Sequence, residues 1–182
     1  RTCDVVGLDT LVHVANGLKQ NCLDDEEREL FELPDYISKM VENNWLGSKS
    51  GQGFYKKTKD ENGKKTILAL DLDTLEYKKP DKVKFPTLEM AKPIEDLRQR
   101  TKMLVMGMDK AGEFYRRIFG GLLAYVSNRI PEISDEFYKI DDALKAGFGW
   151  ELGPFESWDL FGFEQGAKYI KDANKEMGNA ID

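Results

Sequence analysis

The chain has 182 residues, a net charge of −6, and 41% hydrophobic against 33% charged residues. Such a length supports one domain or two small ones, and the composition is typical of a soluble globular protein. The acidic balance argues against nucleic acid as the main partner, and the short apolar runs exclude a membrane span. The two cysteines have no metal-ligand spacing and form no disulfide framework, so a cytoplasmic location is expected.

Two similar phrases lie near opposite ends of the sequence. With an offset of 155 residues, Asp4 matches Asp159 and Gly7 matches Gly162, each within a pattern of acid, two apolar residues and glycine. We interpret the match as a tandem repeat. The first copy lacks its N-terminal part and the second lacks its C-terminal part, so the natural protein is expected to be longer on both sides.

The repeat gives the expected domain organisation. The first helical copy spans residues 1–90 and carries a β insertion, the second spans residues 91–182, and together they form one compact domain.

In the first copy, the apolar spacing predicts a helix from Thr10 to about Lys19, capped by Asp9, with His13 on its polar side. A second helix is predicted with Pro34 in its first turn and Gly47 at its end.

Short strand-like segments follow at 53–57, 65–70 and 75–79, and they predict a small antiparallel hairpin or meander at about 53–78. Between Lys49 and Lys84 there are ten lysines against six acids. The favoured interpretation is that these lysines protect exposed strand edges from pairing with other chains. The alternative is a surface for a phosphate-bearing ligand or another domain, with Lys49, Lys56 and Lys57 as candidates for substrate binding.

In the second copy, residues 85–93 are predicted to be a connector. Helices are expected from Ile94 to Met108, from Lys110 to Pro131, and from Ser134 or Asp135, which would cap it, to Gly147. Residues 147–162 are rich in turn residues and aromatics, and a last helix is predicted from Phe163 to the end of the chain. The expected fold is therefore mainly α with one β insertion.

The sequence contains few residues or motifs that are typical of a catalytic site. The glycines of residues 47–53 lack the spacing of a dinucleotide-binding loop or a P-loop, and His13, the only histidine, is expected at the surface. We assign no catalytic, cofactor-binding or metal-binding residue. Trp150, Phe155 and Trp158 are aromatics that could line an apolar groove or belong to the core.

Several residues are assigned structural roles in turns, helix ends and helix entries. Gly51 and Gly53 are expected to allow a tight turn into a strand, and Gly147, Gly149 and Gly153 to end a helix and shape the next loop. The structural motif residues are Asp4, Gly7, Asp9, Gly51, Gly53, Phe54, Gly149, Gly153, Pro154, Asp159 and Gly162.

Four phrases carry a family resemblance when taken in order. DVVGLDTLVHV, WLGSKSGQGFYKK, YVSNRIPEI and AGFGWELGPFESWDLFG resemble the duplicated C-terminal helical domain of bacterial 3-hydroxyacyl-CoA dehydrogenases. The likeness is greatest to the long β-oxidation enzymes, in which this region lies between an NAD-binding domain and an enoyl-CoA hydratase-like domain. It implies a fold similar to the C-terminal domain of 6-phosphogluconate dehydrogenase.

The resemblance also implies a reaction, which is oxidation of an L-3-hydroxyacyl-CoA with hydride transfer to NAD. Its catalytic histidine and glutamate belong to the NAD-binding domain, so His13 inherits no catalytic role. The family's site also has an asparagine in an Asn-Arg phrase, which would lie in the missing part of the first copy. Its counterpart in the second copy, Asn128, would face away from the NAD-binding domain and inherits no role either. The chain alone is expected to be inactive and to bind no NAD. Two alternatives remain, a non-catalytic scaffold with the same fold and a helical domain of a dehydrogenase acting on a 2-hydroxy or sugar acid.

Overall fold

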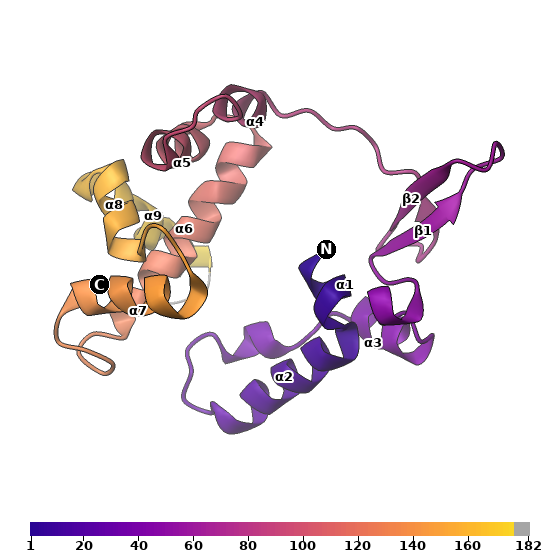
Figure 1. The fold of residues 1–182 in the computed structure, drawn as a ribbon. Helices are drawn as coiled ribbons and strands as arrows, with labels where there is room; N and C mark the ends of the chain where they lie inside the picture. Colours follow the sequence, from indigo (N-terminus) through magenta and orange to yellow (C-terminus); the bar gives the residue numbers. More distant parts are fainter. Residues whose placement is uncertain (177–182) are drawn as a thin grey trace. The chain divides into compact units, whose positions relative to one another are not determined.

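The computed structural model describes residues 1–176, and the chain divides into two compact units, Arg1–Lys82 and Val83–Asp182 (Figure 1). Both units contain helices, and the first also contains a small antiparallel sheet. The prediction of a mainly α fold with one β insertion is therefore confirmed. The part of the last predicted helix that falls on residues 177–182 lies outside the described residues.

The first unit begins with two helices joined by a single glycine. Helix α1 (Thr2–Val6) ends at Gly7, whose φ of 107° lets the chain enter α2 (Leu8–Asn21) at once. The expected cap at Asp9 is wrong, because α2 begins one residue earlier and Asp9 lies in its first turn without capping it. The short 3-10 helix η1 (Arg28–Phe31) and helix α3 (Asp35–Glu42) follow.

Helix α3 is shorter than predicted. It ends at Glu42 rather than near Gly47, because Asn43 is its C-cap and Asn44 adopts a positive φ of 59°. Gly47 has a different role, since a Cβ atom there would lie 2.3 Å from the backbone oxygen of Asp4. The 3-10 helix η2 (Ser48–Ser50) then leads into the sheet.

The sheet has the order β1-β2-β3, with both pairs antiparallel. Its strands are β1 (Tyr55–Lys59), β2 (Lys65–Leu70) and β3 (Tyr77–Lys78), as the sequence predicts. The core of the first unit joins the helices to this sheet through four buried residues, which are Leu8, Ile37, Met40 and Leu70.

Among the described residues of the second unit, all regular secondary structure is helical. Its helices are α4 (Pro86–Ala91), α5 (Leu97–Met106), α6 (Lys110–Asn128), α7 (Phe137–Phe148), α8 (Pro154–Phe161) and α9 (Phe163–Glu176). Helix α9 packs along α6, as Figure 1 shows. The contact is close at Gly120, where an added Cβ would lie 2.7 Å from the backbone oxygen of Tyr169.

Four predictions for this unit need correction. The connector at 85–93 contains α4, and the turn-rich segment 147–162 contains α8, because in both cases a proline occupies the start of a helix, where its missing N–H costs nothing. Helix α7 continues to Phe148 and ends at Gly149, which has the left-handed conformation. Neither Ser134 nor Asp135 caps it, since the Ser134 hydroxyl accepts a hydrogen bond from the N–H of Glu136 instead.

One carboxylate connects two helices of this unit, α4 and α6. Asp109 caps α6 by accepting hydrogen bonds from the N–H groups of Ala111 and Gly112, both at 3.1 Å, and it also accepts one from Thr87 in α4 at 2.9 Å. The Thr87 N–H, followed by the α6 amides, holds the pKa of Asp109 below its usual range. The ionised carboxylate therefore stabilises the second unit.

Asp109→Asn is expected to lower the melting temperature at neutral pH, because the amide cannot serve donors on both sides. Since the folded-state pKa of Asp109 is depressed, its contribution to stability is present above the unfolded-state pKa of about 4 and is lost as the pH falls through the folded-state pKa. Thermal unfolding at pH 7 and pH 3 measures this effect. The matched control is Asp96→Asn, because Asp96 caps α5 through a single bond from Gln99. Equal losses in the two variants would contradict the bridging role.

Candidate functional site

A buried carboxylate organises the first unit. Asp4 in α1 is 7% exposed, and its two oxygens accept hydrogen bonds from consecutive backbone N–H groups, those of Phe54 at 2.8 Å and Tyr55 at 2.9 Å. A Cβ at Gly53 would lie 2.3 Å from Oδ1 of Asp4, so only glycine allows this approach. We call this arrangement the Asp4 clamp. It fastens the first helix to the entry of strand β1.

Aromatic side chains surround the clamp. The Tyr77 hydroxyl donates to the backbone oxygen of Gly53 at 2.5 Å, and the Trp45 ring packs edge-on against the Tyr77 ring at 5.5 Å. Burial raises the pKa of the Tyr77 phenol, and the Asp4 charge raises it further. Both effects keep Tyr77 neutral and donating.

The glycine-rich loop 47–53 does not fit an NAD phosphate site. A dinucleotide-binding loop offers free backbone N–H groups between a parallel strand and a helix. Here the loop enters an antiparallel strand, and the N–H groups of Phe54 and Tyr55 are already bound to the Asp4 carboxylate, whose charge would repel a pyrophosphate.

The three candidate substrate-binding lysines are not gathered into one cluster. The Lys49 ammonium pairs with Asp9 at 2.5 Å and lowers the pKa of that carboxyl. Lys56 lies over the Tyr77 ring at 5.4 Å, and Lys57 is exposed on the next residue of β1, hence on the opposite face. Because β1 is an edge strand, the placement of Lys56 and Lys57 accords with edge protection.

A second carboxylate clamp lies in the other unit, and the sequence analysis missed it. Asp141 of α7, 3% exposed, accepts from the N–H groups of Phe155 at 2.8 Å and Glu156 at 3.1 Å. Gly153 has no side chain with which to cap α8 and Pro154 has no N–H, so Asp141 satisfies the next two free amides of that helix. Burial raises the pKa of Asp141, and the two N–H donors oppose that shift.

Glu156 completes the start of α8. Its carboxylate accepts from the N–H of Gly153 at 2.8 Å and pairs with Lys145 at 3.0 Å. These two partners, the Gly153 amide first, lower the pKa of Glu156. The signal available in the sequence was therefore the phrase Gly-Pro-Phe-Glu preceded by an acid in a helix.

An aromatic stack borders this second clamp. The rings of Phe155 and Trp158 are parallel at 6.3 Å, and those of Trp158 and Phe163 at 5.7 Å. The stack lines a groove of about 500 Å³ that also includes Asp141 and Asp159. Of the two interpretations of these aromatics, the structure favours the groove for Phe155 and Trp158, while Trp150 is 42% exposed outside it.

A further groove, of about 660 Å³, lies between α5, α6 and α9. Exposed cationic side chains border it, and Phe161 and Tyr169 form part of its apolar floor. The cations at its rim are Lys102, Arg117 and Lys168. Arg116, at the same groove, is fixed by donating to the backbone oxygen of Val105 at 2.9 Å.

The other residues considered in the sequence lie outside these features. His13 is exposed on α2, as expected, and Asn128 is the last residue of α6. Across residues 1–176, no helix combines the length and apolarity that a bilayer span requires. Within the same range, no group of three or more His, Cys, Asp or Glu side chains is arranged to hold a metal ion.

Comparison with known proteins agrees with this architecture. The family model described as 3-hydroxyacyl-CoA dehydrogenase, C-terminal domain, matches residues 1–57, which include every residue of the Asp4 clamp. A probable 3-hydroxyacyl-CoA dehydrogenase of Bacillus subtilis is 43% identical over 97% of the chain. Residues 1–57 therefore belong to the C-terminal domain family of the 3-hydroxyacyl-CoA dehydrogenases, and nearly the whole chain is similar to a member of that family.

Two further relatives also match this chain. A putative fatty acid oxidation complex trifunctional enzyme of Rickettsia felis is 24% identical over 94% of the chain, and a probable 3-hydroxyacyl-CoA dehydrogenase of Deinococcus radiodurans is 49% identical over 34% of the chain and 17% of its own length. The chain spans 22% of the length of the Bacillus and Rickettsia relatives. No solved structure matches it significantly.

Asp4→Asn is expected to destabilise the first unit by about 2–3 kcal/mol, because a buried amide can accept from only one of the two N–H groups and leaves the other unpaired. Denaturant unfolding measures the loss. The control is Asp9→Asn, five residues along the chain. That change removes the same charge from an exposed pair, so its effect should be small and should shrink further in high salt. A small effect of Asp4→Asn would contradict the structural importance of the clamp.

Gly53→Ala should destabilise the same unit by about 2 kcal/mol, because its Cβ would overlap the Asp4 carboxylate. Gly17→Ala is the opposite case, since Gly17 lies within α2 with no atom within 4 Å of an added Cβ. That change should stabilise by about 0.5–1 kcal/mol. Thermal unfolding of both variants tests the difference in sign, and stabilisation by Gly53→Ala would refute the close approach.

Proposed function

We propose that this chain is the substrate-side and assembly domain of an NAD-dependent L-3-hydroxyacyl-CoA dehydrogenase of fatty acid β-oxidation. The observation that carries the proposal is the 43% identity to the Bacillus relative over nearly the whole chain. The match of residues 1–57 to a C-terminal domain supports a position after a nucleotide-binding domain.

The proposed reaction passes a hydride from the 3-carbon of the acyl-CoA to NAD and the hydroxyl proton to a base. NAD supplies the hydride acceptor when bound. The described residues offer no NAD phosphate site in loop 47–53, and His13, the sole histidine of the chain, lies on the polar side of α2. We therefore assign NAD and the catalytic histidine and glutamate to an upstream NAD-binding domain of the same polypeptide.

The proposed role of this chain is to bind the acyl-CoA substrate and to hold the domains of the protein together. Val5, Val6 and Val14 on α1 and α2 are each more than half exposed, which gives the first unit apolar surface suited to contact with another domain. The proposed partners are the acyl-CoA substrate, the upstream NAD-binding domain and a downstream hydratase-like domain, within the cytoplasm. Lys49, Lys56 and Lys57 remain candidates for contact with the CoA phosphates.

The test compares this chain with the full-length protein, using acetoacetyl-CoA and NADH followed by absorbance. The full-length protein should turn over, and the 182-residue chain should not exceed the uncatalysed rate. His13→Asn in the full-length protein should change kcat by less than about twofold, because a surface histidine transfers no proton in the reaction. Turnover by the chain alone would contradict the proposal, and an inactive full-length protein would favour the non-catalytic scaffold.

A further inference from the structure

The groove between α5, α6 and α9 has a firmly packed apolar floor. Its volume of about 660 Å³ falls within the range of small-ligand pockets, about 300–1,000 Å³. Val105 in the floor is fully buried and Tyr169 is 7% exposed. The rings of Phe161 and Tyr169 meet edge-on at 6.0 Å, so neighbouring side chains hold this floor in place.

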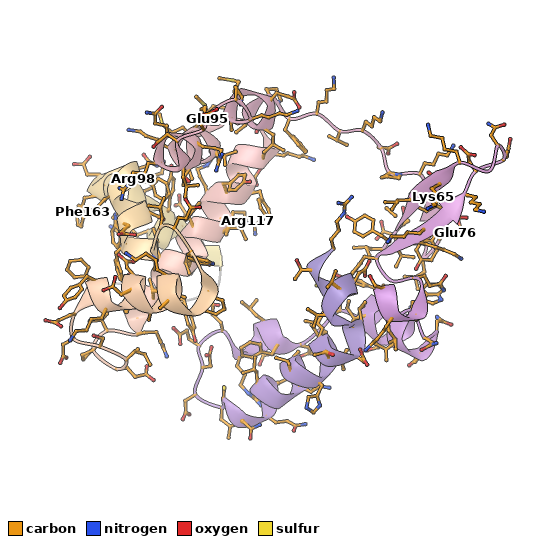
Figure 2. The ribbon with its side chains drawn as sticks, in the orientation of Figure 1. Lys65, Glu76, Glu95, Arg98, Arg117 and Phe163 are labelled. Atoms are coloured by element: carbon orange, nitrogen blue, oxygen red, sulfur yellow. The ribbon has the colours of Figure 1, made fainter. Side chains whose placement is uncertain are left out.

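Positive charge exceeds negative charge around the groove. Four of its lining residues are cationic and two are acidic, which leaves a local balance of +2 on a chain whose net charge is −6. The cations are Lys102 on α5, Arg116 and Arg117 on α6, where Figure 2 labels Arg117, and Lys168 on α9, and the acids are Glu113 and Asp172. The groove is therefore a cationic site on an acidic protein, and it favours an anionic ligand.

The two lysines of the rim are not neutralised by acidic side chains. Lys102 and Lys168 are exposed, and neither forms an ion pair with any group of residues 1–176. They lie on different helices on two sides of the groove. Both ammonium groups are therefore available to one anion.

Arg116 is held at the groove by the end of α5. Its Nη1 donates to the backbone oxygen of Val105 at 2.9 Å and also to that of Gly107, which are carbonyl groups without partners inside the helix. Among residues 1–176 the Nε and Nη2 groups of Arg116 have no acceptor. A guanidinium fixed in this way retains N–H donors for a carboxylate or a phosphate.

Two methionines extend the apolar surface at the mouth of the groove. Met106 is 63% exposed and Met108 is 93% exposed. The methionine side chain is flexible and polarisable, so it adapts to apolar ligands of irregular shape. An apolar chain bound here would remove this surface from water.

We propose that this groove is a binding site for an amphiphilic anion, a molecule with one carboxylate or phosphate head and one unbranched apolar chain. Lys102, Lys168 and Arg116 bind the head. The chain lies on the floor formed by Phe161 and Tyr169, and the two methionines cover it. The site uses no residue assigned to the dehydrogenase reaction, and the proposal does not depend on that reaction.

Isothermal titration calorimetry of the full-length protein with laurate tests the chemistry of the ligand. Laurate should bind at least about tenfold more tightly than octanoate, because four further CH₂ groups are buried. It should also bind at least about tenfold more tightly than dodecyltrimethylammonium, which has the same chain and the opposite charge. No binding of laurate, or equal binding of the cationic amphiphile, would overturn the proposal.

Dodecyl phosphate distinguishes the two heads. Tighter binding of dodecyl phosphate than of laurate would identify a phosphate-headed ligand, and the reverse order a carboxylate-headed one. Each result supports the site and names its ligand class.

Charge reversal at the rim tests the residues. The double variant Lys102→Glu, Lys168→Glu should weaken laurate binding by at least about tenfold, because both ammonium groups are lost from the head. The matched control is Lys64→Glu, Lys65→Glu, which makes the same change of net charge with two exposed lysines of the first unit. The control should change binding by less than about twofold, because its charges are screened by salt. Equal effects of the two pairs would overturn the assignment.

Photolabelling of the unaltered protein keeps the test independent of variant folding. Laurate with a diazirine at the end of its chain should label residues 105–108 or 161–173 on illumination, mapped by mass spectrometry. Octanoate in excess should not protect these residues, whereas laurate in excess should. Labelling confined to other parts of the protein would overturn the proposal.

Discussion

The first unit depends on the way one buried charge is satisfied. A carboxylate removed from water is costly unless donors replace the lost solvent, and Asp4 finds them in two consecutive backbone amides. This requirement fixes the surrounding sequence. Gly47 and Gly53 must both lack side chains, because the chain passes against the backbone of Asp4 at one position and against its carboxylate at the other. The glycines of this loop therefore allow close packing against Asp4 and do not form a ligand-binding loop.

The second unit also uses a buried carboxylate to bind free backbone amides, at the start of a helix. There the free amides belong to the first turn of α8, and Asp141 caps them from a neighbouring helix. A glycine lies against the carboxylate again, at Gly153. Both clamps hold backbone rather than ligand, which is why a chain with few catalytic side chains can still have strongly constrained sequence phrases.

The sequence predicted those features whose causes are local. The helices α2, α6 and α9 and the three strands follow from periodicity and turn residues, and the ordered phrases identified the family. Helices α4 and α8 were missed because Pro86 and Pro154 resemble breaks, although proline at the first helical position is favourable. The Asp141 clamp was missed because residues 147–162 were interpreted as turn-rich, so the free amides at the start of α8 were not foreseen.

The span of each clamp has a consequence for synthesis on the ribosome. The Asp141 carboxylate bonds to an amide 14 residues away, so its loop can close as soon as α8 emerges. The Asp4 carboxylate must wait for an amide 50 residues later, and closing so long a loop is slower. Until Leu70 has left the exit tunnel, the core that buries Leu8 of the second helix is incomplete. Of the two units, the one that is translated earlier is thus the one whose completion is more delayed relative to its start.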